Sequence, residues 1–287
     1  MHREVLFYNL TQSALEKMAP GIDLKKYYEL VDYREDDEGV QTKGKTGISQ
    51  VFYLMVSHSQ NATMISNVIK FDENYEALND KLFGFDPIEV CNQYNVTGPV
   101  QIGDDIVKKL VEELRPKLGW KNKENQKRPD ALAKRFAATA LNCAFFLKDF
   151  NSKQEVIDEL FSHYAGNSFK SFMEYFAQRI PTGFSIALTC DFLKELDKKF
   201  NDLAKPDVHI IDTLSELDNN PRKYRNTKGP YACIERMREI VDIVNREKGD
   251  NITVYQLDRM IWLVCTGNFF LDAPTKAEYL KSVKKLN

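Results

Sequence analysis

The sequence is poor in the residues that build metal centres. Its five cysteines lie more than thirty residues apart and form no C-x-x-C pair, and only four histidines are present. This spacing argues against a zinc site and against an iron–sulfur cluster, so we expect no metal and no cofactor. An odd number of cysteines in apolar surroundings predicts buried thiols in a reducing compartment. The expected location is therefore intracellular, in cytoplasm and nucleoid or in a nucleus.

Long apolar runs and familiar catalytic motifs are also missing. No run approaches the roughly 20 apolar residues that cross a bilayer, so we expect no membrane partner. G-x-S-x-G, P-loop, G-x-G-x-x-G and H-E-x-x-H motifs do not occur. The net charge of −2 and the pI near 6.2 count mildly against a dedicated nucleic-acid binder. Lysine and arginine are nevertheless concentrated in residues 117–134 and 194–205.

Strand-like alternation is scarce, whereas helical periodicity is frequent. Segment 251–255 is the one serious strand candidate, and it fits a helix start equally well. Elsewhere apolar residues recur at steps of three and four, which is typical of amphipathic helices. The predicted fold class is all-α. Helices are expected at 13–18, 24–31, 50–70 with a break near 57–60, 74–82, 87–94, 103–114, 130–147, 155–164, 168–178, 186–196, 232–247 and 254–270.

One segment has the composition of a linker. Residues 115–129, RPKLGWKNKENQKRP, are polar and cationic and contain two prolines. A chain of 287 residues forms one or two domains. We predict a single unit over residues 1–287 with two approximate lobes. Residues 1–114 and the C-terminal helices 232–287 form one lobe, 130–231 form the other, and 115–129 connect them.

Residues 179–214 carry the most information about function. The turn Pro-Thr-Gly-Phe at 181–184 opens the apolar run 186–196, and Pro-Asp-Val-His-Ile begins another apolar segment at Pro206. Asp207 lies 22 residues after Ser185 and suits a helix start, where a carboxylate caps backbone N–H groups. Taken alone, such an aspartate is usually no more than a cap.

This order of segments resembles the helix-hairpin-helix (HhH-GPD) superfamily of DNA base-excision glycosylases. In that family a hairpin of the form P-G-V-G-x-K-x-A precedes an aspartate in V-D-x-H-[IVM]. Aligned on Gly183 and Ala187, the present hairpin has Pro181 in place of one family glycine. The resemblance spans about residues 50–270. It implies a two-lobed helical glycosylase fold and a monomer that acts on double-stranded DNA carrying a damaged or modified base.

The resemblance also implies roles for single residues. Asp207 would be catalytic, since a carboxylate stabilises the positive charge that develops on deoxyribose as the base departs. The family lysine that forms a Schiff base falls at Ser185, which implies a DNA N-glycosylase (a hydrolase) that uses water and lacks lyase activity. The residues that would contact DNA here are Thr182, Gly183, Phe184, Ser185 and His209.

Two other segments resemble parts of the family site. Gln60 and Asn61 match amides that fill the gap left by a flipped base, although a polar helix break explains them equally well. The closing helix would line a base pocket through Trp262, Phe269 or Phe270, and Trp262 also fits a core position.

Two alternatives remain open at the level of sequence. The first is a non-catalytic helix-hairpin-helix DNA-binding module, which the missing lysine and the slightly acidic pI favour. The second is an all-α interaction protein without a nucleic-acid role. The sequence does not identify the base that an enzyme of this kind would excise.

Overall fold

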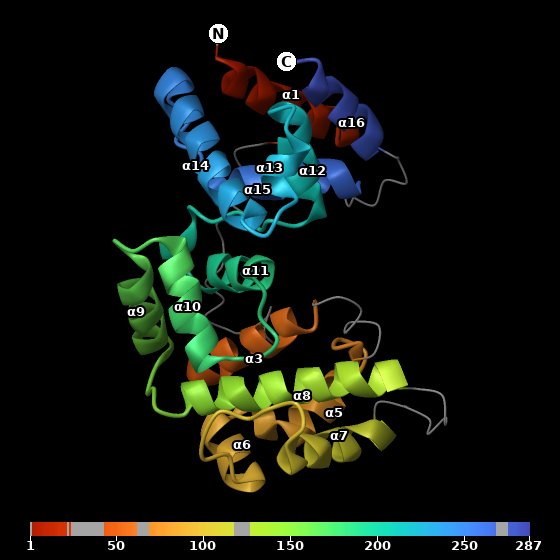
Figure 1. Ribbon diagram of the computed structural model, residues 1–287, viewed down its shortest axis with the longest axis vertical. Helices are drawn as coiled ribbons and strands as arrows, with labels where there is room; N and C mark the ends of the chain where they lie inside the picture. Colours follow the sequence, from red (N-terminus) through yellow and green to blue (C-terminus); the bar gives the residue numbers. More distant parts are fainter. Residues whose placement is uncertain (1, 22, 24–42, 62–68, 118–126, 268–274) are drawn as a thin grey trace. The chain divides into compact units, whose positions relative to one another are not determined.

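The computed structural model describes residues 2–21, 23, 43–61, 69–117, 127–267 and 275–287. Every regular element in these residues is a helix, so the predicted all-α fold class is confirmed (Figure 1). None of the helices in the described ranges is long and apolar enough to cross a membrane.

The helices fall into two compact units. Unit 1 combines Met1–Arg34 with Leu193–Asn287, and unit 2 is Glu35–Phe192, so that α11 (Ile186–Leu196) contributes residues to both. Unit 1 contains α1 (Arg3–Met18), η2 (Lys198–Phe200), α12 (Val208–Leu217), α13 (Pro221–Tyr224), α14 (Gly229–Lys248), α15 (Val254–Thr266) and α16 (Thr275–Lys284). Unit 2 contains α3 (Gly47–Ser59), α5 (Tyr75–Lys81), η1 (Phe83–Phe85), α6 (Pro87–Tyr94), α7 (Asp105–Lys117), α8 (Lys127–Leu147), α9 (Lys153–Tyr164) and α10 (Phe169–Arg179).

These units divide the chain differently from the predicted lobes. Residues 43–114 were expected beside the chain ends, but they belong to unit 2 because α3, α6 and α7 pack on α8. Residues 193–231 belong to unit 1 because α12 packs on α14, α15 and α16. Segment 115–129 therefore connects two helices of unit 2, and α7 and α8 extend into it from either side.

Side-chain caps explain where several of the helices begin. Asp86 accepts hydrogen bonds from two backbone N–H groups of α6, with proline at the first helical position. Ser152 caps α9 by accepting one backbone N–H, that of Glu155. Thr253 and Gln256 form a capping box, so segment 251–255 is the start of α15 and not a strand.

Other helix limits differ from the sequence prediction. α1 begins at Arg3, ten residues before the expected start at 13, and α13 and α16 were not expected at all. The predicted break near 57–60 is confirmed, because α3 ends at Ser59. The helix expected at 24–31 lies outside the described residues.

Helix α8 is the central helix of unit 2. Its middle section is buried almost without interruption, from Phe136 to Ala144, which confirms that this segment belongs to a core. α3, α6 and α7 pack on α8 (Figure 1). Several of the buried positions of α8 are alanines, whose small side chains favour close packing. Each fully buried phenylalanine or leucine here contributes about 1.5–3 kcal/mol.

The predicted buried thiols are confirmed. All five cysteines are buried and none forms a disulfide. Burial raises the pKa of the Cys91 and Cys265 thiols to about 11. Because only the thiolate is nucleophilic, these two cysteines are packing residues and not reactive groups at neutral pH.

A buried ionic network ties the N-terminal helix to the rest of unit 1. Arg236 on α14 donates hydrogen bonds to Glu4 on α1 at 2.6 Å and to Asp218, just after α12, at 3.2 Å. The Arg236 side chain is only 8% exposed and both carboxylates are 11% exposed. Burial alone would raise the pKa of Asp218, but the hydrogen bond from Tyr224 and the charge of Arg236 hold it below its ordinary value. The carboxylates are therefore ionised at neutral pH.

We expect Arg236→Met to lower the free energy of unfolding of unit 1 by about 3–5 kcal/mol, because it leaves the Glu4 carboxylate buried without its guanidinium and removes one of the cations that pair with Asp218. The pKa of Glu4 is also lowered in the fold. The stabilisation by both carboxylates is thus present above their unfolded pKa values near 4 and is lost as pH falls through the lower folded values. Urea titrations followed by circular dichroism, at pH 7 and in acid, measure both effects.

Arg238 provides the matched control on the same helix. Its guanidinium lies 2.8 Å from Asp202 and the side chain is 32% exposed. Since solvent screens such a pair, Arg238→Met is expected to cost no more than about 1 kcal/mol. Equal losses in the two variants would contradict the importance of the buried network.

Candidate functional site

The predicted hairpin joins α10 to α11 in unit 2 and packs closely on α8. Gly183 has a φ of +89°, and a β-carbon there would lie 2.0 Å from Oγ1 of Thr139. Both the backbone conformation and the lack of space therefore require glycine at this position. This is the glycine on which the hairpin aligns with the family form.

Asn142 of α8 fixes the hairpin to a second loop. Its side-chain amide donates to Thr182 Oγ1 at 3.1 Å and to the Val100 carbonyl at 3.0 Å, and its oxygen accepts the Val100 N–H at 2.8 Å. Asn142 is fully buried. The Thr182 hydroxyl thus faces α8, which leaves the backbone as the part of Thr182 that could contact a ligand.

The backbone N–H groups at the start of α11 and in the turn before it are the next feature of the hairpin. Within the described residues, no hydrogen bond is donated by the N–H groups from Thr182 to Ala187. Ser185 caps α11, because its hydroxyl accepts the Leu188 N–H at 3.3 Å. Unpaired N–H groups at a helix N-terminus carry partial positive charge and favour an anion. Arg179, the last residue of α10, is exposed two residues before the turn, and Arg135 is exposed on α8 one turn before Thr139.

The Phe184 side chain has a structural role. Its ring packs edge-on against Phe176 at 5.4 Å and Phe192 at 6.0 Å between ring centroids. These contacts anchor the turn between the two helices that it connects. Of the four predicted hairpin contacts, Phe184 can therefore offer only its backbone to a ligand.

The predicted amide pair follows the end of α3. The Gln60 side-chain oxygen accepts the Phe71 N–H at 3.2 Å, so part of this amide is used within the protein. Asn61 is exposed, and its backbone N–H donates to the His58 carbonyl. Gln60 thus fits the alternative of a polar helix break that the sequence left open. The Asn61 side-chain amide makes no hydrogen bond with the described residues.

A histidine–carboxylate pair next to this loop was not predicted. His58 Nδ1 lies 3.3 Å from Asp191 Oδ2 of α11, and both side chains are less than 15% exposed. The His58 ring also packs edge-on against Phe192. The two residues are 133 positions apart, and no local motif connects them. Pairing of this kind becomes visible only in three dimensions.

Asp207 caps α12 in unit 1, and the predicted helix start is confirmed. One carboxylate oxygen, Oδ1, accepts the N–H groups of His209 and Ile210 at 2.8 and 3.2 Å. Within the described residues the other oxygen, Oδ2, accepts no hydrogen bond. Asp207 is only half-buried. The cap therefore holds the carboxylate in place while one of its oxygens remains available.

Asp212, five residues further along the chain, is engaged differently. It forms ion pairs with Arg225 and with Lys276, the latter at 2.8 Å. Both of its oxygens are thus used by cations of neighbouring helices. Of these two carboxylates of α12, Asp207 is therefore the one that keeps an oxygen without a partner among the described residues.

His209 is half-buried beside Asp207. Burial lowers its pKa, and the positive charges of Lys276 and Lys205 act in the same direction, against the opposing charge of Asp207. Its Nδ1 atom is buried and has no hydrogen-bond partner in the part of the chain that the structure describes. At neutral pH the imidazole is therefore uncharged.

Of the three aromatic residues predicted to line a base pocket, the structure describes Trp262. Trp262 is half-buried and packs against the core of unit 1, and the Arg259 guanidinium lies 5.3 Å from its ring. This arrangement agrees with the core position that the sequence left open for Trp262. Phe269 and Phe270 lie outside the described residues.

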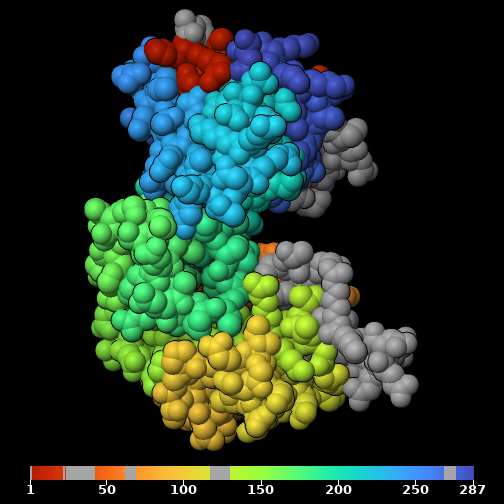
Figure 2. Space-filling model, viewed as in Figure 1, coloured from red at the N-terminus to blue at the C-terminus, as the bar shows by residue number. Residues whose placement is uncertain are grey.

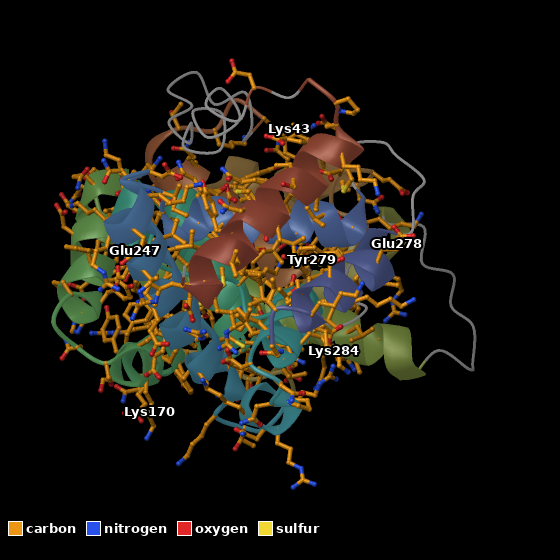
Figure 3. All side chains as sticks on the ribbon, turned by 90° about the horizontal axis from the view of Figure 1, so that it is seen from above. Lys43, Lys170, Glu247, Glu278, Tyr279 and Lys284 are labelled. Atoms are coloured by element: carbon orange, nitrogen blue, oxygen red, sulfur yellow. The ribbon has the colours of Figure 1, made fainter. Side chains whose placement is uncertain are left out.

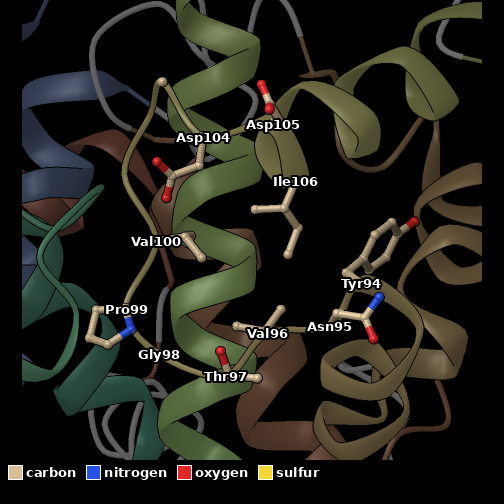
Figure 4. Close-up of a pocket in the computed structure, with 11 residues that line it drawn as sticks. Tyr94, Asn95, Val96, Thr97, Gly98, Pro99, Val100, Asp104, Asp105 and Ile106 are labelled. Atoms are coloured by element: carbon tan, nitrogen blue, oxygen red, sulfur yellow. The ribbon is translucent and has the colours of Figure 1, made fainter.

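A cavity of about 660 Å³ lies elsewhere in unit 2, between α6 and α7 (Figure 4). It is lined by residues 94–100, 103–106 and includes the side chains of Asp104 and Asp105. None of the predicted site residues lines it. Among the described residues, no group of histidine, cysteine and carboxylate side chains could hold a metal ion.

Comparisons of the chain with protein-family models, with curated proteins and with solved structures found no match. The resemblance to helix-hairpin-helix glycosylases consequently stays a prediction from the sequence.

We expect Gly183→Ala to destabilise unit 2 by roughly 2–5 kcal/mol. Left-handed backbone strain accounts for about 1–2 kcal/mol, and the collision with Thr139 for about 1–3 kcal/mol. Gly166 is the matched control, since its φ is +77° but nothing lies within 4 Å of its β-carbon position. Urea unfolding of both variants isolates the collision, and equal losses would show that the hairpin does not depend on contact with α8.

The pKa of His209 predicts a pH dependence of stability. Because the folded value lies below the unfolded value of about 6.5, the folded state binds fewer protons between the two values. The free energy of unfolding should therefore fall as pH is lowered through this interval, and His209→Gln should reduce that fall. NMR titration of the imidazole and urea unfolding from pH 8 to pH 5 (roughly the range in which His titrates) measure both. A His209 pKa above its ordinary value would contradict the prediction.

Proposed function

We propose that this protein is a DNA N-glycosylase that hydrolyses the bond between deoxyribose and a damaged or modified base. The observation that carries the proposal is the carboxylate of Asp207, which is fixed by the start of α12 through one oxygen and left free at the other. The hairpin with its unpaired N–H groups lies 22 residues earlier in the sequence, in the order typical of such enzymes. No metal and no cofactor enters the proposed reaction.

The proposed role of Asp207 follows from the chemistry of base loss. As the glycosidic bond breaks, positive charge develops on the sugar, and a fixed carboxylate stabilises that charge without reorganising. The free Oδ2 atom would also accept a proton from the attacking water. Since Oδ1 is held by two N–H groups, the carboxylate is positioned before substrate binds.

The hairpin would bind the DNA backbone. N–H groups from Thr182 to Ala187 donate no hydrogen bond within the described residues, so those that solvent reaches could bind a phosphate. Contacts of this type position a protein on DNA without reading its sequence. Ser185 caps α11 and provides no amine, so the proposed enzyme uses water and leaves an abasic site with the strand intact.

A non-catalytic DNA-binding module is the second candidate. It is favoured by the Pro181 substitution in the hairpin and by the use of the Gln60 amide within the protein. This candidate shares the proposed hairpin contact with DNA but predicts that no base is released. The two candidates therefore differ in one measurable step, the release of the base from DNA.

We expect Asp207→Asn to reduce the rate of base release by roughly 10²–10⁴-fold, because asparagine cannot stabilise the cationic transition state or accept a proton. Asparagine caps helices as well as aspartate does, so α12 should remain folded. The measurement is base release from duplexes containing uracil, 8-oxoguanine, hypoxanthine or alkylated purines. Strand breaks should require hot alkali, because they report abasic sites.

Asp86→Asn serves as the matched control. Asp86 caps α6 through two N–H groups, as Asp207 caps α12, and lies in unit 2. Its variant should release bases at the wild-type rate. Undiminished release by Asp207→Asn would rule out the proposed catalytic role. Duplex binding by wild type without release from any of these substrates would favour the non-catalytic module.

A further inference from the structure

The segment Pro221–Lys228 of unit 1 is strongly cationic. Its eight residues, PRKYRNTK, include four lysines and arginines and no carboxylate. All of them are exposed except Tyr224, which is 1% exposed. Residues 208–230 lie on the face of unit 1 that Figure 2 shows in cyan. The segment forms α13 and the turn into α14, and its charges lie outside the lysine and arginine clusters at 117–134 and 194–205.

Buried contacts hold this segment in one conformation. The Tyr224 hydroxyl donates to the buried Asp218 carboxylate. A β-carbon at Gly229 would lie 1.9 Å from the Tyr224 carbonyl oxygen, so the chain returns closely past its own backbone at that point. The Asn226 side chain donates to the carbonyls of Arg222 and Lys223 and accepts the Lys228 N–H. The cations are therefore displayed from an ordered turn.

The four cations fall into two kinds. Lys223 lies 3.4 Å from Asp218, and Arg225 pairs with Asp212. Arg222 and Lys228 have no carboxylate partner within the described residues. Two cations of an eight-residue turn thus remain available to an external anion.

The segment packs against the helix that the candidate carboxylate caps, in the same unit. Arg225 reaches Asp212 on α12, and Asp207 caps the first turn of that helix. α13 packs directly against α12. An anionic polymer that brings a sugar to Asp207 would therefore pass close to these cations.

We propose that Pro221–Lys228 is a second phosphate-binding surface for duplex DNA, in which Arg222 and Lys228 each neutralise a backbone phosphate. This inference rests on the proposed function, since it assigns the same nucleic-acid partner to a surface that the hairpin does not include. Contacts of this kind add affinity equally on all sequences, because phosphates carry no base information.

The test is the salt dependence of binding to a fluorescent lesion-free duplex between about 50 and 200 mM salt. Each phosphate neutralised contributes about 0.9 to the slope of log K against log salt concentration. Arg222→Gln and Lys228→Gln should each lower the slope by about 0.9, and the double variant by about 1.8. A duplex that carries a lesion should show the same reductions.

Arg246→Gln provides the matched control in the same unit. Arg246 is 65% exposed near the C-terminal end of α14, and its neighbour Glu247 is labelled in Figure 3. It lies 17 residues after Gly229, about 26 Å along the helix at 1.5 Å per residue. This variant should keep the wild-type slope.

The possible outcomes distinguish the proposed phosphate-binding surface from the proposed glycosylase activity. A wild-type slope in both Arg222→Gln and Lys228→Gln overturns the inference, even if bases are released. Reduced slopes together with an absence of base release support the surface while the proposed catalysis fails. No duplex binding by wild type at low salt overturns both. Because both side chains are exposed, unchanged urea unfolding of the variants confirms that the slope reports contacts and not stability.

Discussion

The hairpin depends on how closely its backbone approaches α8. Gly183 touches the Thr139 side chain where a β-carbon would stand, and Asn142, one turn further along α8, holds Thr182. These contacts are possible because the neighbouring positions of α8 are alanines and other buried residues that let several elements pack on one helix. α8 therefore sets the conformation in which the hairpin presents its unpaired N–H groups, and a small change in that helix would displace the turn as a whole.

Local physical rules made much of the fold predictable. Asp207 was expected to start a helix because an aspartate after proline and before an apolar run satisfies free N–H groups, and it does so. Thr253 was ambiguous between strand and helix until its capping box with Gln256 was visible. The division into units was predicted less well, since it depends on which helices pack together, and periodicity indicates a buried face without identifying its partner.

The candidate site shows the same limit. The sequence predicted that Asp207 starts a helix, but only the ion pairs with Arg225 and Lys276 reveal that Asp212, on the same helix, is occupied. The pairing of His58 with Asp191 joins residues that share no motif. Polar contacts between distant segments leave no periodic pattern in a single sequence, so they could not have been predicted from it.

The pairing of Arg236 with Glu4 has a consequence for the order in which the chain folds. α1 precedes the helices that it packs against, and these begin at α14, about 210 residues later, with the whole of unit 2 synthesised in between. At about 5–20 residues per second, α1 waits roughly 10–40 seconds for them. Unit 2 is contiguous and can fold during this interval, whereas the apolar face of α1 must stay protected until the last helices emerge.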